Sequence, residues 1–301
     1  MNLKGLGVAM VTPFKEDGNI DFNAIPRIVE NIITGRADYI VVLGTTAEVS
    51  SLSDLEKKTV LKAVIGANKN KLPLIIGIGG NNTAKVIDEI QSTDLNPFQA
   101  ILSVSPYYNK PTQEGIYAHF SKLSSNLEDI SILLYNIPSR CGVNMEPWVI
   151  AKLNSNFPNI KAIKEASGSL DQVSKIISLC DITVLSGDDC LTLPMLSVGA
   201  KGVVSIASNI IPNMMLDMVS SFFNNKINKS IEIHKKLYPI IKSLFIESNP
   251  VPLKYILKKN GYCDSGYVRL PLVNITNSEH INVLNAICNT VKPTVSMTYS
   301  L

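Results

Sequence analysis

Lys164 ends an apolar run near the middle of the sequence, IKAIK at residues 160–164. If this run is a β-strand, side chains alternate between its two faces, and Lys164 shares a face with Ala162 and Ile160. Partial desolvation on an apolar face disfavours the charged form of a lysine and lowers its pKa. A neutral amine can attack a ketone and form an imine. The run therefore indicates a Schiff-base nucleophile, and it is equally typical of a surface lysine whose stem covers a strand end.

Other polar residues follow apolar runs in the same way. Tyr135 ends the run ILLY, Thr45 and Thr46 follow VVLG, and Arg140 comes shortly after the tyrosine. The same alternation places Thr45 on the face of Leu43, so we expect these groups to converge with the lysine at one mouth. Tyrosine and threonine hydroxyls can relay protons during imine formation, and the planar fork of an arginine suits a carboxylate. A core role for Tyr135 and a turn role for the threonines are the alternatives.

The elements that must position these residues alternate regularly along the chain. Eight short β-branched runs alternate with eight longer helical patterns, which predicts repeated βα units and a parallel sheet. The fold class is therefore α/β, a (β/α)8 TIM barrel, whose chemistry lies on the loops at the carboxyl ends of the strands. The predicted strands are Leu6–Val11, Tyr39–Leu43, Leu74–Gly77, Ala100–Val104, Ile132–Tyr135, Ile160–Lys164, Thr183–Ser186 and Gly202–Ile206, and the predicted helices are Phe22–Ile33, Asp54–Ala67, Ala84–Thr93, Gln113–Leu123, Pro147–Leu153, Leu170–Leu179, Leu191–Ser197 and Ile211–Asn224.

The pattern becomes wholly helical after residue 225. We predict a catalytic barrel at residues 1–224 and a C-terminal helical extension at residues 225–301. Two helix starts carry clear signals: Ser53 with Glu56 forms a capping-box pattern, and Thr83 is predicted to cap the following helix. The helices predicted in the extension are Asn228–Ile246, Pro252–Lys259 and Glu279–Thr290.

Several other motifs suggest binding sites that their context does not support. Asp188 and Asp189 resemble a metal-binding pair, but they are predicted to cap the helix that begins near Leu191. The glycines of GIGGNN lack the GxGxxG spacing of a dinucleotide site. The three histidines stand on separate predicted helices without metal-ligand spacing, and they are His119, His234 and His280. We therefore expect no metal ion and no organic cofactor.

Composition limits the remaining function classes. The chain has 301 residues, 46% of them hydrophobic, and a net charge of +3 without a basic run, which does not suggest nucleic-acid binding. No uninterrupted apolar stretch reaches the length of a membrane span, and the N-terminal apolar stretch fits a first core strand. Five widely spaced cysteines fit neither CxxC nor a disulfide framework, which predicts a reducing, cytoplasmic setting.

With these residues in view, the sequence resembles the dihydrodipicolinate synthase family, within the larger group of N-acetylneuraminate lyase-like aldolases. The resemblance covers nearly the whole chain and becomes looser after the GVVSIASN segment. Five motifs occur in the family's order: VVLGTTAE at residues 41–48, SPYYNKPTQEG at 105–115, LLYNIPSRCGV at 133–143, IKEASG at 163–168 and LSGDD at 185–189.

The resemblance implies a role for each matching position. Lys164 matches the lysine that forms an imine with pyruvate, and Tyr135 matches the tyrosine that shuttles protons. Thr45 matches the threonine that links this tyrosine to a second one. Tyr108 matches that second tyrosine, which a neighbouring subunit lends across a dimer interface. The remaining matches line the substrate pocket, with Thr46 on the pyruvate carboxylate and Gly187 and Val204 along the wall.

Arg140 distinguishes the branches of this superfamily. In the family's synthases an arginine at this position meets the carboxylate of aspartate semialdehyde, whereas sialic acid lyases lack it. Three departures from the family pattern occur: Ala47 and Val49 replace a glycine and a serine, and Cys141 replaces a threonine. None removes a group that the chemistry needs.

The resemblance thus implies Schiff-base condensation of pyruvate with L-aspartate 4-semialdehyde in a homotetramer, with no nucleic-acid or membrane partner. Two alternatives are an aldolase acting on sialic acid or a 2-keto-3-deoxy sugar acid, and a non-catalytic keto-acid-binding barrel. Arg140 argues against the first, and the intact catalytic set argues against the second. Inhibition by lysine is expected to be weak or absent, because Lys85 stands where feedback-sensitive relatives place a glutamate.

Overall fold

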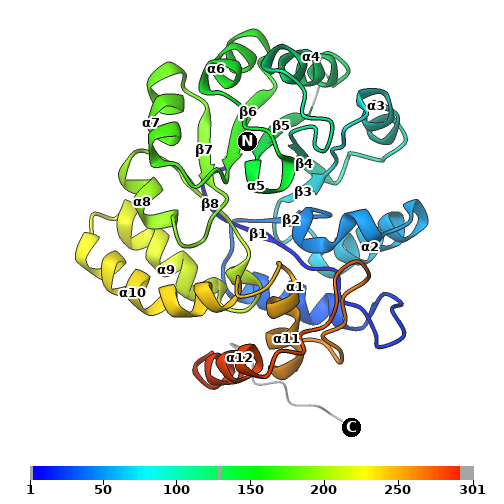
Figure 1. Ribbon diagram of the computed structural model, residues 1–301, viewed down its shortest axis with the longest axis vertical. Coiled ribbons are helices and arrows are strands. Elements are labelled where there is room, and N and C mark those ends of the chain that lie inside the picture. Colours follow the sequence, from blue (N-terminus) through cyan, green and yellow to red (C-terminus); the bar gives the residue numbers. More distant parts are fainter. Residues whose placement is uncertain (1–2, 128–129, 292–301) are drawn as a thin grey trace. The chain divides into compact units, whose positions relative to one another are not determined.

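The computed structural model describes residues 3–127 and 130–291. Its eight strands follow one another in chain order around a closed parallel barrel (Figure 1). The predicted (β/α)8 fold class is therefore confirmed. The strands are β1 (Gly5–Ala9), β2 (Tyr39–Val42), β3 (Leu74–Gly77), β4 (Phe98–Val104), β5 (Ser131–Asn136), β6 (Ile160–Glu165), β7 (Thr183–Ser186) and β8 (Gly202–Ser205).

Helices alternate with these strands, and a wholly helical part follows the last one. Every bound of a predicted strand or helix lies within three residues of the observed one. The short α5 and three 3-10 helices were not predicted, because segments of three or four residues carry no periodicity. The α-helices are α1 (Ala24–Thr34), α2 (Asp54–Asn68), α3 (Thr83–Gln91), α4 (Gln113–Ser124), α5 (Pro138–Cys141), α6 (Pro147–Asn156), α7 (Leu170–Leu179), α8 (Thr192–Ser197), α9 (Pro212–Phe223), α10 (Ile227–Ser243), α11 (Val251–Lys259) and α12 (Ser278–Thr290).

The described chain divides into two compact units. The first unit combines the residues up to Gly7 with Pro73–Val204. The second combines Val8–Leu72 with the described residues from Ser205 on.

In the first unit, the strands are in register at their carboxyl ends. Tyr135 of β5 lies opposite Lys164 of β6, and Lys164 lies opposite Leu185 of β7. One residue further along, Asn136 lies opposite Glu165. Because residues paired in register share a face of the sheet, Tyr135 and Lys164 point one way and Asn136 and Glu165 point the other.

In the second unit, the C-terminal helical part is bonded to the N-terminal segment. The Asn209 side chain donates to the carbonyl of Ala9 at 2.8 Å and accepts from the amide of Val11 at 3.2 Å. The hydroxyl of Tyr262 donates to Asn31 on α1 at 2.9 Å, and both side chains are buried. These buried bonds join segments that lie far apart in the sequence.

The helix starts test two predicted caps. The capping box of Ser53 and Glu56 is present at the start of α2, as predicted. Thr83 was predicted to cap α3, and this was wrong. Asn82 is the cap, because its backbone is extended and its side-chain oxygen accepts from the amide of Lys85 at 3.2 Å. Thr83 is the first helical residue.

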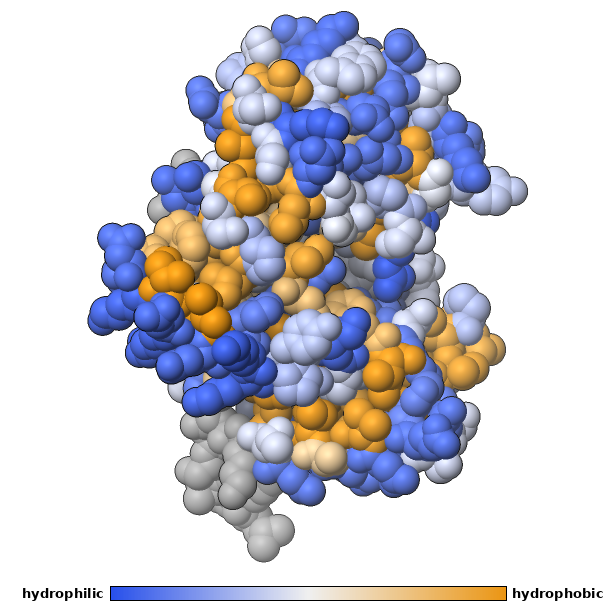
Figure 2. Space-filling view, turned by 60° about the vertical axis from the view of Figure 1, so that its left-hand side comes forward, coloured by the Kyte–Doolittle hydropathy of each residue, from blue (hydrophilic) through white to orange (hydrophobic). Residues whose placement is uncertain are grey.

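The surface alternates between apolar and charged side chains. Figure 2 shows apolar patches that are interrupted by hydrophilic side chains on the face in view. Exposed large apolar residues include Phe223 at the end of α9 and Ile227 and Ile231 in the first turns of α10. Among the described helices, none combines the length and apolar composition that a membrane span requires.

Gly202 of β8 lies so close to β1 that it has no space for a side chain. A methyl group on Gly202 would lie 2.1 Å from the carbonyl oxygen of Gly5, a backbone atom that cannot move aside cheaply. Gly202→Ala is therefore expected to destabilise the protein by about 3 kcal/mol, at the upper end for overpacking. Gly66→Ala in exposed α2 meets nothing within 4 Å and is expected to stabilise it by about 0.5–1 kcal/mol. Urea unfolding of both variants measures these changes, and equal stability of the two would contradict this account of β8.

Candidate active site

Lys164 lies at the carboxyl end of β6 and is only 4% exposed. The structure therefore rules out the alternative of a surface lysine. Burial lowers the pKa of the Lys164 amine to about 8, the charge of Asp189 raises it, and that of Arg140 lowers it further. An ordinary lysine has a pKa near 10.5, so burial makes the neutral, nucleophilic amine far more abundant near neutral pH.

Tyr135 is the immediate neighbour of this amine. The Nζ atom of Lys164 lies 4.3 Å from the centroid of the Tyr135 ring, and Tyr135 is 4% exposed. The strand alternation that predicted a shared face for these two residues is confirmed by their register. Tyr135 is therefore a buried aromatic and also the neighbour of a buried amine.

Gly187 follows β7 and leaves space beside the lysine. A methyl group at this position would lie 3.1 Å from Cγ of Lys164 and 2.7 Å from Cβ of Ala166. The Gly187 amide donates to the carbonyl of Glu165 at 2.8 Å, which fixes the chain at this close approach. Val204, the other predicted wall residue of this unit, is buried in β8.

Arg140 is exposed and lies on the short helix α5, which follows β5 directly. The positive charge of Arg140 contributes to the lowered pKa of the Lys164 amine. The adjacent Cys141 is buried, and its Sγ donates to the carbonyl of Ser105 at 3.5 Å. Burial raises the pKa of the Cys141 thiol to about 11, so this cysteine is held as a neutral packing group.

Tyr108 is 88% exposed, in contrast to the buried Lys164 and Tyr135. Its backbone φ is 75°, in the left-handed region that a bulky residue seldom adopts. The preceding residue, Tyr107, is 40% exposed, and its carbonyl accepts from the side chain of Asn81 at 3.1 Å. Within one chain the structure does not bury Tyr108 in any site.

Thr45 and Thr46 belong to the second unit. The strand-alternation argument for Thr45 was wrong, because β2 ends at Val42 and Leu43 has a left-handed φ of 56°. The residues Thr45–Ala47 instead form a 3-10 helix. Thr46 is buried, and its hydroxyl accepts from the side-chain amide of Asn249 at 3.1 Å.

Asp189 was not recognised from the sequence as a neighbour of the lysine. It is buried, and its charge raises the pKa of the Lys164 amine. The predicted helix-capping role of the aspartate pair was wrong. Asp188 accepts from the amides of Cys190 and Leu191 in the turn, whereas α8 begins at Thr192 and has no side-chain cap. A pair of aspartates before a helix is the ordinary sign of a cap, so the sequence offered no contrary signal.

A carboxylate behind Lys164 was also missed. Glu165 is 1% exposed and accepts from three groups: Asn136 at 2.9 Å, Gln172 at 3.0 Å and the amide of Ser167 at 2.6 Å. The Asn136 side chain also accepts from the amide of Met145 at 3.0 Å. Asn136 therefore links Met145, in the segment after α5, to Glu165 on the strand that carries Lys164.

The histidines and acidic residues do not assemble a metal site. Within residues 3–127 and 130–291, no group of three or more His, Cys, Asp and Glu side chains could hold a metal ion. The histidines have other partners or surroundings: His119 lies 2.9 Å from the Thr83 hydroxyl, and His280 lies 2.9 Å from the Glu247 carboxylate.

A (β/α)8 barrel with a buried lysine of lowered pKa at a strand end is suited to the imine chemistry of an aldolase-type lyase. The sequence model of the Dihydrodipicolinate synthetase family matches residues 2–290. This chain therefore belongs to the Dihydrodipicolinate synthetase family, as its motifs predicted.

Individual relatives agree with this assignment. A 4-hydroxy-tetrahydrodipicolinate synthase of Flavobacterium psychrophilum is 45% identical over 273 residues, which cover 90% of this chain and 92% of the relative. The structure of the synthase from Methylacidiphilum fumariolicum has a TM-score of 0.92 at 38% identity, covering 96% of each chain. The dihydrodipicolinate synthase of Acinetobacter baumannii, solved in complex with pyruvate, has a TM-score of 0.91 at 33% identity and covers 96% of this chain and 99% of that one.

The charges around Lys164 make a prediction about pH. Imine formation between Lys164 and pyruvate is expected to reach half its maximal rate near pH 8 and to level off about one pH unit higher, because only a neutral amine attacks a ketone. Asp189→Asn should shift the midpoint to lower pH, since Asp189 raises this pKa, and Arg140→Ala should shift it to higher pH. Rapid mixing followed by borohydride quench at each pH measures the rate. A rate still rising at pH 9.5, or shifts of the same sign in both variants, would contradict this electrostatic account.

Proposed function

We propose that this chain condenses pyruvate with L-aspartate 4-semialdehyde to give 4-hydroxy-tetrahydrodipicolinate, on the route to diaminopimelate and lysine. The observation that carries the proposal is the buried Lys164 amine beside the Tyr135 ring, with a pKa lowered to about 8. The names of the relatives support the same reaction, and the A. baumannii synthase complexed with pyruvate supports the first substrate.

The reaction begins at the amine of Lys164. Its Nζ attacks C2 of pyruvate, and the carbonyl oxygen leaves as water to give an imine. Loss of a methyl proton converts the imine into an enamine, whose terminal carbon attacks the aldehyde carbon of the second substrate. The amino group of that substrate then attacks C2, closes the ring and expels the amine of Lys164. The protonated imine is itself the electron sink, so the steps need no metal or organic cofactor.

Protons must move at several of these steps, and hydroxyl groups are suited to carry them. Tyr135 lies against the amine and is the first member of the proposed relay. Thr45 and Tyr108 are the further members. Because Tyr108 is 88% exposed on a left-handed backbone, we propose that it completes the relay of a second copy of the chain. This role requires at least a dimer, and we propose a homotetramer built as a dimer of dimers.

The substrate-binding residues are also part of the proposal. We propose that Thr46 binds the pyruvate carboxylate and that Gly187 and Val204 line the pocket. Gly187 supports this role because only a residue without Cβ leaves the space beside Lys164 open. Arg140 is exposed on the short helix α5, and its positive charge lowers the pKa of the Lys164 amine. We propose that it binds the carboxylate of aspartate semialdehyde.

Three broader predictions about the protein stay predictions. The division into a barrel at residues 1–224 and an extension at 225–301 is one. Cytoplasmic localisation is another, and it is supported by the five cysteines, all within the described residues, none of which forms a disulfide. Weak or absent inhibition by lysine is the third. It rests on the positive charge of Lys85, and Asp54, a carboxylate of the same expected cleft that could attract a bound lysine, is already paired with Lys57 at 3.4 Å.

Arg140 gives the most specific test of the second substrate. Arg140→Ala is expected to lower kcat/KM for aspartate semialdehyde by about 30-fold or more, because losing a charge-assisted pair typically costs about 2–5 kcal/mol. Arg140→Lys should also be clearly impaired, since an ammonium cannot form the planar fork. Steady-state rates with varied semialdehyde measure both effects, while pyruvate trapping at saturating pyruvate should persist in both variants. Full condensation activity in Arg140→Lys would count against the role.

A further inference from the structure

The loop that carries Thr46 is bracketed by two residues in an unfavourable backbone conformation. Leu43 has a φ of 56° and Glu48 a φ of 54°, both in the left-handed region, and neither is a glycine. Such conformations persist only where the surrounding contacts determine them. The contacts that hold this loop come from the C-terminal helical part of the second unit.

Glu48 is held by a buried ion pair. Its side chain is 3% exposed and pairs with the ammonium of Lys254 on α11, which is 1% exposed. Lys254 also donates to the carbonyl of Tyr267 at 3.1 Å and lies 3.8 Å above the ring of Phe14. The backbone amide of Arg269 donates to the second oxygen of the Glu48 carboxylate at 3.0 Å. Moving Glu48 away from Lys254 would leave an unpaired buried charge, which is strongly destabilising, so the pair holds the loop at Glu48.

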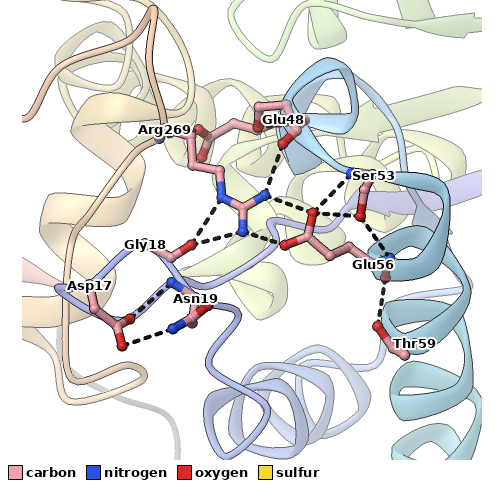
Figure 3. A network of polar contacts seen from close by, with 9 residues as sticks. Asp17, Gly18, Asn19, Glu48, Ser53, Glu56, Thr59 and Arg269 are labelled. Atoms are coloured by element: carbon pink, nitrogen blue, oxygen red, sulfur yellow. Dashed lines mark hydrogen bonds and ion pairs between the residues drawn. The ribbon is translucent and has the colours of Figure 1, made fainter.

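Arg269 forms hydrogen bonds and an ion pair with segments on both sides of the loop, as Figure 3 shows. Its guanidinium pairs with Glu56 on α2 and donates to the carbonyl of Ser51 at 2.8 Å. It also donates to the carbonyl of Gly18 through two nitrogens, at 3.0 and 2.8 Å. The chain that follows α11 is thus tied to the segments before and after the Thr46 loop.

Asn249 acts on Thr46 itself. Its side-chain amide donates to the Thr46 hydroxyl at 3.1 Å, and both residues are buried. A hydroxyl carries one proton and two lone pairs, so a hydroxyl that accepts here keeps its proton to donate elsewhere. That polarity suits a carboxylate, which in its ionised form only accepts.

We propose that Asn249 and Lys254 are positioning residues that hold Thr46 with its hydroxyl oriented to donate to the carboxylate of the keto acid. Asn249 sets the direction of the hydroxyl proton, and Lys254 fixes the loop backbone through Glu48. This inference rests on the proposed function, in which Thr46 binds pyruvate.

A double-mutant cycle between Asn249 and Thr46 tests the inference. The readout is the pyruvate concentration that gives half-maximal borohydride labelling of Lys164. Asn249→Ala is expected to raise this concentration by about tenfold, the usual effect of one hydrogen bond to a charged group, with little change in kcat at saturating pyruvate. In a Thr46→Val background, Asn249→Ala should have no further effect. An undiminished effect in that background would overturn the positioning role, because Asn249 would then act without Thr46.

Lys254 is tested against a matched lysine of the same helix. Lys254→Met should raise the half-saturating pyruvate concentration several-fold, whereas Lys258→Met removes only an exposed pair with Glu16 and should leave it unchanged. If Lys254→Met fails to fold, the double variant Glu48→Gln with Lys254→Met is used in its place. The double variant removes both charges of the pair and so leaves no unpaired buried charge. Unchanged pyruvate affinity in the folded variant would contradict the role of Lys254. Absence of labelling in the parent protein would instead contradict the proposed function, so the two failures are distinguishable.

Discussion

The burial of one amine is the constraint on which the rest of the site depends. Lys164 is almost wholly removed from water, and desolvation lowers its pKa against the opposing charge of Asp189. An amine buried in this way has a fixed position and a large neutral fraction, the two properties that a nucleophile needs. Gly187 leaves space beside this amine, and the charges of Asp189 and Arg140 adjust its pKa in opposite directions.

In the first unit, residues on both faces of the sheet contribute to the position of Lys164. Tyr135 and Lys164 form the pair on one face, and the next residues along the same strands, Asn136 and Glu165, are bonded on the other. This bond joins the two strands one residue beyond Tyr135 and Lys164. Glu165 also accepts from Gln172 on α7, so the strand end is bonded to the following helix as well as to the preceding strand.

The sequence predicted the parts of this arrangement that depend on regular structure. The alternation of side chains holds for Lys164 and Tyr135 because β5 and β6 continue to the reactive residues. It fails for Thr45 because β2 ends earlier, at a left-handed Leu43, and no propensity predicts that conformation for a leucine. Asp189 was missed because its effect on Lys164 arises from tertiary proximity. The bond from Asn249 to Thr46 joins residues that are 203 positions apart, so no local pattern contains it.

Lys164, and no other lysine, is proposed to form the covalent link with pyruvate. Intact mass spectrometry after incubation with pyruvate and borohydride tests it most directly, with peptide mapping to locate the adduct. We expect one reduced adduct on Lys164, absent in Lys164→Ala and retained in Lys161→Ala, because Lys161 is exposed at the other end of β6. An adduct that survives in Lys164→Ala would contradict it.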